Sequence, residues 1–141
     1  MQLMHQKDYD LLKELCPPAD YKATRIDFAF RWVFDRMSNR DNFRSQYHKK
    51  PGRFLIREDR EKCEALALSF FTSMQAAEKQ FRILKTHLGA NVYRTLGTRL
   101  AAGYLRESDG LNSRPDQRGH FNHHPFETAR HAERFKIIDI L

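Results

Sequence analysis

Apolar residues recur most regularly between residues 58 and 88 of the chain. Over this stretch they alternate at four- and three-residue steps: Cys63, Ala67, Phe70, Met74, Ala77, Phe81, Leu84 and Leu88. This spacing is typical of one face of an α-helix. Acidic residues at the start and basic residues at the end suit the helix dipole, and Gly89 fits the position just beyond the end. The pattern favours one long amphipathic helix over 58-88, around which the fold is organised. Its length of roughly 45 Å is large for a small domain, so two helices with a break near residues 69-73 are the alternative.

A second helix is expected over 92-106, directly after the first. Val92, Leu96, Leu100 and Tyr104 share one helical face, and Asn91 can cap the start. The linker is short, so the two helices are expected to pack as an antiparallel hairpin. A DNA-reading helix-turn-helix with Gly89 at the turn is an alternative interpretation, although its first helix would be unusually long.

Residues 25-37 fit two patterns. Aromatic and apolar residues alternate with polar ones as in a strand, but Ile26, Ala29, Val33 and Met37 also form one face of a helix. We favour the helix, because charged residues recur four positions apart on another face and Thr24 can cap the start.

The remaining elements are shorter. A helix over 8-16 is stopped by Pro17 and Pro18, residues 38-57 form an irregular connection, and a last helix runs from Pro125 through Phe135 into an extended tail at 137-141. The sequence therefore predicts a mainly α protein, an irregular helical bundle of about five helices in a single globular domain over 1-141.

The composition provides enough bulky apolar material for a core, with 40% hydrophobic residues and eleven Phe. No apolar run approaches the ~18 residues of a membrane span, and the first residues lack the apolar segment of a signal peptide. Cys16 and Cys63 form no close-spaced motif. We therefore expect a cytoplasmic protein with no membrane partner and two buried thiols.

Positive charge is concentrated in one segment. The formal net charge is +7, and residues 36-57 contain seven Lys or Arg against the single acid Asp41. Such clustering indicates a polyanionic partner. Aromatic residues interleaved with cations suit stacking on unpaired bases while the cations hold phosphates. The expected binding residues are Arg40, Phe43, Arg44, Tyr47, Lys49, Lys50, Arg53 and Arg57.

Nucleic acid, RNA or DNA, is the first candidate for this partner. The alternative is that the same segment is the interface of a protein-interaction module or inhibitor that binds an acidic protein. The sequence does not determine the oligomeric state.

Four of the seven histidines lie between residues 118 and 131. Histidine titrates near neutral pH and can move protons in RNA cleavage, while an arginine stabilises the charged phosphate. A metal-independent ribonuclease is therefore a third hypothesis, with Arg118, His120, His123 and His124 as its catalytic candidates. The spacing of Arg118 and His123 resembles the arginine–histidine element of the all-helical HEPN ribonucleases, which act without metal. Gly119 departs from that family's pattern, and we do not assign the family.

The same histidines contain the atoms that zinc prefers. His120, His123, Glu127 and His131 are the metal-ligand candidates, but their spacing matches no standard motif, so neither a metal nor a cofactor is expected. A purely structural role is the alternative, with Glu127 as a favourable acid in the first turn of a helix. Phosphate-binding loops, dinucleotide fingerprints and nucleophile elbows are absent from the sequence, so it does not decide whether the protein is an enzyme.

Overall fold

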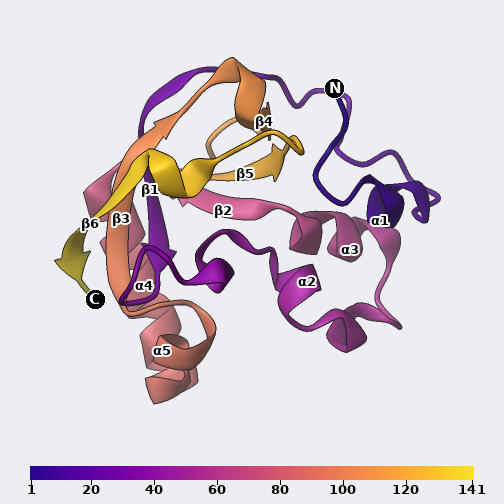
Figure 1. Ribbon diagram of the computed structural model, residues 1–141. Helices are drawn as coiled ribbons and strands as arrows, with labels where there is room; N and C mark the ends of the chain where they lie inside the picture. The colour runs from indigo at the N-terminus through magenta and orange to yellow at the C-terminus, as the bar shows by residue number, and fades with distance from the viewer.

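A computed structural model describes all 141 residues. Its centre is a six-stranded antiparallel sheet with the strand order β4-β5-β2-β1-β3-β6 (Figure 1). The strands are β1 (Ile26–Val33), β2 (Leu68–Phe71), β3 (Arg99–Leu105), β4 (Gly110–Asn112), β5 (His120–Pro125) and β6 (Phe135–Ile140). The predicted mainly α helical bundle is therefore wrong.

The helices are short apart from α4. They are α1 (Gln6–Asp10), α2 (Gln46–Lys49), α3 (Asp59–Leu66), α4 (Met74–Leu88) and α5 (Val92–Thr95). Five 3-10 turns complete the chain: η1 (Arg40–Phe43), η2 (Pro51–Phe54), η3 (Gly89–Asn91), η4 (Glu107–Asp109) and η5 (His131–Glu133). None of these helices combines the length and apolar character that a membrane span requires.

The predicted helix over 58-88 is interrupted by a strand. α3 ends at Leu66, β2 follows, and α4 begins after Ser73, whose Oγ accepts a hydrogen bond from the amide of Ala76 (3.0 Å). The reason lies in Phe70 and Phe71, which are both almost completely buried although they are adjacent. A strand directs neighbouring side chains to opposite faces of a sheet, and here both faces are covered.

The same cause explains the other incorrect helices. In β1, Ala29 and Val33 face one core while Phe30 and Trp32 face the other, so the strand interpretation of residues 25-37 is correct. The predicted 92-106 helix contains only α5 before β3 begins. The helical hairpin and the helix-turn-helix are wrong for this reason. The expected last helix is replaced by β5, η5 and β6, whereas the extended tail is confirmed by β6.

Two cores lie on opposite faces of the sheet. α4 packs on one face, where Ala77 contacts Phe71 and Leu100 (Figure 1). On the other face, Phe70 packs with residues of four further strands, and Phe43 of η1 covers them. A smaller cluster of Leu3, Tyr9 and Leu66 joins the N-terminal segment to α3.

The two cysteines are not free thiols. Cys16 and Cys63 form a disulfide with a Cα–Cα distance of 5.8 Å that links the segment after α1 to α3. The expectation of two buried thiols is therefore wrong.

Candidate functional site

The candidate site begins where β1 and β2 meet. These neighbouring strands pair only at Phe30 and Phe71, whereas β1 and β3 pair along most of their length. Arg31 lies directly after that single pair. Its Nε donates a hydrogen bond to the carbonyl of Asn42 (2.7 Å), and its Nη1 donates one to the carbonyl of Ser69 (2.8 Å). A guanidinium group thus links two strands that make few backbone hydrogen bonds to each other.

Arg31 is a buried cation without an acidic partner. Only 8% of the residue is exposed, and it takes part in none of the ion pairs of the protein. Burial lowers the pKa of Arg31 to about 10, so it stays charged at neutral pH. A buried charge is costly unless it is paired. Arg31 also lines a cavity, where an anionic ligand would supply the missing partner.

Arg44 and Lys49 reach the same cavity from the segment around α2. Arg44 donates from Nη1 to Asp41 (3.1 Å) and from Nη2 to the carbonyl of His48 (3.0 Å). Burial, followed by the positive charge of Arg31, lowers the pKa of Lys49 to about 8. Like charges are therefore held close together here, which favours binding of an anion.

A tight turn before β5 positions Arg118 and the first residue of the strand, His120. Asp116 Oδ1 accepts hydrogen bonds from the amides of Arg118 (2.8 Å) and His120 (3.0 Å), and Oδ2 lies 3.2 Å from Arg118 Nη2. Gly119 adopts a φ of 75°, a left-handed conformation that glycine tolerates readily. The turn thereby places one cation and one imidazole at the cavity.

His120 connects this turn to β2. Its Nε2 lies 3.0 Å from Ser69 Oγ, and its Nδ1 lies 3.7 Å from Asp116 Oδ2. Burial lowers the pKa of His120, so the ring is neutral at pH 7 and can accept a proton. A hydroxyl, a base and an acid thus lie in a row beside the cations: Ser69, His120 and Asp116.

The cavity has a volume of about 250 Å³. No Asp or Glu lines it, whereas four cations do: Arg31, Arg44, Lys49 and Arg118. Trp32 and Phe71 of the sheet form part of its wall, and the Trp32 indole is held by a hydrogen bond to the carbonyl of Ala77 (3.0 Å). Positive groups beside aromatic rings suit a ligand that carries both phosphate and an aromatic base.

A larger groove of about 750 Å³ adjoins this cavity and shares Arg44 and Lys49 with it. The groove adds three cations and contains one acid, Asp41. Phe34 and Phe54 also line it, and the ammonium of Lys49 lies 5.4 Å from the ring of Phe34. The three added cations are Lys50, Arg53 and Arg94. Cavity and groove together form a continuous basic depression.

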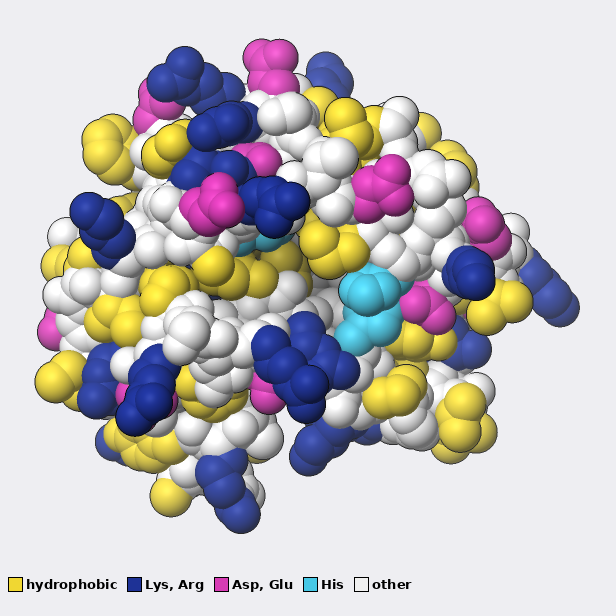
Figure 2. Space-filling model, viewed as in Figure 1, with side chains coloured by type: hydrophobic (Ala, Val, Ile, Leu, Met, Phe, Trp, Pro, Cys, Tyr) yellow, Lys and Arg dark blue, Asp and Glu magenta, His cyan; other side chains and the backbone are white.

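Half of the predicted binding residues line this depression. They are Arg44, Lys49, Lys50 and Arg53. Figure 2 shows Lys and Arg side chains gathered over and below α2, on a face where histidine side chains also lie beside an acidic one.

The other four predicted residues lie elsewhere. Phe43 stacks on His131 with 5.3 Å between ring centroids, and Arg40 borders a separate cavity beside it. Tyr47 packs against the cluster that contains Leu3, and Arg57 lies 3.7 Å from Glu61 in an exposed ion pair.

The predicted catalytic residues are separated by the alternation of β5. Arg118 and His120 line the basic cavity, but His123 faces the opposite core. His123 Nδ1 donates to Asn112 Oδ1 (2.5 Å), and its Nε2 accepts from His131 Nε2 (2.9 Å). Burial holds the pKa of His123 well below its usual range.

His124 is buried beside the disulfide, where its Nδ1 lies 2.8 Å from the hydroxyl of Tyr9. Arg118 and His123 lie in a turn and a strand, so the helical context of the HEPN resemblance is absent.

The predicted metal candidates do not form one group. His123 and His131 touch, but His120 lies in the basic cavity and Glu127 is exposed. Two other groups have ligand atoms within 4.8 Å of one another. One consists of His5, Asp8 and His48, and the other of Cys16, Cys63 and His124.

Sequence reasoning missed Arg31 and Ser69. The helix predicted over 25-37 has Arg31 on its polar face, and the long helix predicted over 58-88 includes Ser69. The alternation of apolar residues around Arg31 was the one available signal, because it marks a strand with a charged residue on a covered face.

Comparison with known proteins finds no matching family model, no matching curated protein and no matching solved structure.

Proposed function

We propose that this protein binds a phosphate-bearing nucleotide ligand in the basic depression, with single-stranded RNA as the first candidate. One observation carries the proposal: four cations line a cavity that contains no carboxylate. Arg31 and Lys49 are held there despite the cost of burial and mutual repulsion, and a phosphate would relieve both.

The shape of the site favours unpaired nucleotides over a duplex. The cavity of about 250 Å³ has room for a single nucleotide unit, and the adjoining groove can follow a short stretch of backbone. Aromatic walls suit stacking on exposed bases, which a duplex does not offer. A free nucleoside diphosphate or dinucleotide presents the same chemistry, so the experiment has to separate these ligands.

Fluorescence anisotropy with labelled single-stranded RNA, duplex RNA and duplex DNA tests the proposal. We expect the single strand to bind most tightly and its affinity to fall steeply with salt. Competition with unlabelled nucleoside diphosphate and dinucleotide then shows whether the small molecules occupy the same cavity. If none of these ligands binds at low salt, the proposal is wrong and an acidic protein becomes the expected partner.

A pair of variants connects binding to the depression. Arg44→Gln with Lys49→Gln should weaken RNA binding at least ~10-fold, because two charge-assisted phosphate contacts are lost. Arg25→Gln with Lys136→Gln removes the same charge from exposed positions outside the cavity and groove and should leave the affinity almost unchanged.

Metal-independent RNA cleavage is a second candidate function. The hydrogen bond between His120 and Ser69 supports it, because it places a neutral imidazole beside the cations of the cavity. In this reaction His120 accepts the proton of a ribose 2′-hydroxyl, whose oxygen attacks the adjacent phosphorus. The P–O5′ bond breaks, water protonates the leaving oxygen, and Arg118 stabilises the phosphate in the transition state.

The RNA from the binding experiment also tests this activity. We expect a 2′,3′-cyclic phosphate product from the wild type and its loss in His120→Ala. His87→Ala, at an exposed position on α4, is the matched control. Wild-type protein that binds RNA without cleaving it would exclude the catalytic role and leave the binding function intact.

A further inference from the structure

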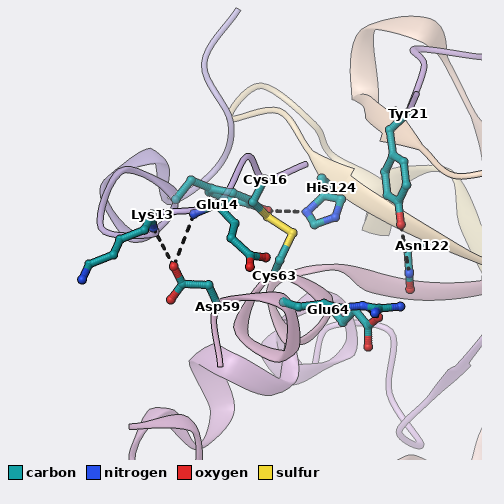
Figure 3. Close-up of a disulfide and its surroundings, with 11 residues drawn as sticks. Lys13, Glu14, Cys16, Tyr21, Asp59, Cys63, Glu64, Asn122 and His124 are labelled. Carbon is teal, nitrogen blue, oxygen red and sulfur yellow. Dashed lines mark hydrogen bonds and ion pairs between the residues drawn. A yellow bond between two sulfur atoms is a disulfide. The ribbon is translucent and has the colours of Figure 1, made fainter. Parts of the chain in front are cut away.

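The Cys16–Cys63 disulfide lies beside the buried side chain of His124. Figure 3 shows the ring of His124 next to the Cys16–Cys63 disulfide. The two sulfurs and a ring nitrogen all lie within 4.8 Å of one another. Thiolate sulfur and imidazole nitrogen are the usual ligands of zinc. With the sulfurs joined to each other, however, the set cannot hold a metal.

The ring of His124 is buried and held in a fixed orientation. Only 1% of His124 is exposed, and its Nδ1 faces the hydroxyl of Tyr9. The contact of 2.8 Å between this hydroxyl and His124 Nδ1 holds the ring in place. Such a fixed orientation is typical of metal-binding histidines.

The segment that carries Cys16 is attached to α3 by more than the disulfide. Oδ2 of Asp59, at the start of α3, accepts hydrogen bonds from the amides of Lys13 (2.6 Å) and Glu14 (3.3 Å) (Figure 3). These bonds do not depend on the oxidation state of sulfur. Both thiols should therefore remain near His124 after the disulfide is reduced.

A cavity of about 290 Å³ borders Cys63 and His124. Glu14 and Glu64 also line it (Figure 3). The sulfurs can thus separate toward open space, and either water or a carboxylate can complete a tetrahedral set.

We propose that reduction of the Cys16–Cys63 disulfide creates a zinc site formed by both sulfurs and His124. A dithiol reductant supplies two electrons and two protons, becomes a disulfide itself, and breaks the S–S bond. Zn²⁺ then binds the two thiolates and the imidazole, and the two thiol protons are released to solvent. The oxidised protein is held together by the disulfide and the reduced protein by the metal.

Metal titrations of the oxidised and the phosphine-reduced protein test this inference. The reduced wild type should bind one Zn²⁺ at least ~100-fold more tightly than the oxidised form, as measured by competition with a chromophoric chelator. Co²⁺ in place of Zn²⁺ should give a thiolate-to-cobalt charge-transfer band only after reduction. Zinc should also raise the melting temperature of the reduced protein.

Variants separate this site from the second ligand group. His48→Asn removes a ligand of the His5, Asp8 and His48 group and should leave the reduction-dependent binding unchanged. Cys63→Ser should abolish the charge-transfer band, and His124→Asn should weaken binding on the order of 10- to 100-fold. The proposal is overturned if the reduced wild type shows no such band, or if zinc binds equally well before and after reduction. Both of these tests use the wild-type chain.

Discussion

Arg31 and Arg134 are both buried arginines, and both are close enough to influence the titration of His131. The Arg134 side chain is 8% exposed and forms an ion pair with Asp109. Arg31 is equally buried, but its hydrogen bonds go only to backbone carbonyls. A cation that is neutralised within the protein stabilises the fold. A cation that lacks an acid and lines a cavity is available to an anionic ligand.

At the Arg134–Asp109 ion pair, called the paired site below, the carboxylate of Asp109 has a second role. Its Oδ2 accepts a hydrogen bond from the amide of Arg106 (2.6 Å), which fixes the turn between β3 and β4. No comparable group faces Arg31, where the nearest rings are those of Phe43 and Phe70. The two sites therefore predict opposite outcomes when their charges are removed.

The largest expected effect is on stability at the paired site. Asp109→Asn leaves Arg134 buried without a counter-charge, and it should lower the free energy of unfolding by about 3–5 kcal/mol. Urea unfolding measures this change. Asp27→Asn, which breaks the exposed pair with Arg25, is the control and should cost less than about 1 kcal/mol. Equal effects of the two variants would contradict the assignment of a structural role to Asp109.

At Arg31, which has no acidic partner, the main effect should be on RNA binding. Arg31→Gln is expected to weaken RNA binding about 10- to 100-fold, because one charge-assisted contact to phosphate is lost. Its free energy of unfolding should change less than that of Asp109→Asn, because removal of an unpaired buried charge offsets part of the lost hydrogen bonding. If Arg31→Gln strongly lowers the free energy of unfolding but the folded variant binds RNA with wild-type affinity, the role of Arg31 is structural and the comparison is reversed.

The pH dependence of stability reports on the region between the two arginines. Burial lowers the pKa of His131 to about 4. The negative charge of Asp109 raises this pKa, whereas the charges of Arg31 and Arg134 lower it. Between pH 6.5 and 4 the unfolded chain binds a proton that the folded protein does not. The free energy of unfolding should therefore fall as the pH falls through this window, by up to about 3 kcal/mol for this histidine alone.

Urea unfolding at pH 7 and pH 4.5 measures this dependence. His131→Gln should reduce it, whereas His87→Gln at an exposed position should not. In a proton NMR titration, Arg31→Gln should raise the pKa of His131, because one nearby positive charge is removed. An unchanged titration would show that the charge of Arg31 is already neutralised.

The smallest expected effect is at the rim of the groove. Arg53 is exposed, so Arg53→Gln should weaken RNA binding only about two- to three-fold and reduce the salt slope by about 0.7. Anisotropy titrations at several salt concentrations measure this slope. Lys136→Gln is the matched control, and a larger loss for Arg53 than for Arg31 would move the principal phosphate contact from the cavity to the rim.

Local sequence predicted the basic segment better than it predicted the fold. Lys49, Lys50 and Arg53 are close in sequence, and they line neighbouring parts of one depression. The long helix failed because its apolar spacing continues across two helices and the strand between them. Phe70 and Phe71 are buried on opposite faces of a covered sheet, and apolar residues there follow no simple alternation.

The candidate site could not be predicted from local sequence either. Its chemistry depends on contacts between distant residues, such as the one between Arg31 and the carbonyl of Ser69, 38 positions apart. The proposed zinc site likewise combines Cys16 and His124, which no local pattern connects. Strand alternation on β5 directs His120 to the cavity and His123 to the core.

The sequence by itself determined the excess of positive charge, its concentration in one segment and the supply of aromatic residues. These are properties of composition and of neighbouring residues. Only the tertiary structure decided which cations lack an acidic partner, which histidines are buried and which thiols meet. The physical reason is that β-sheet pairing takes its stability from contacts between residues far apart in the chain, which local propensity does not specify.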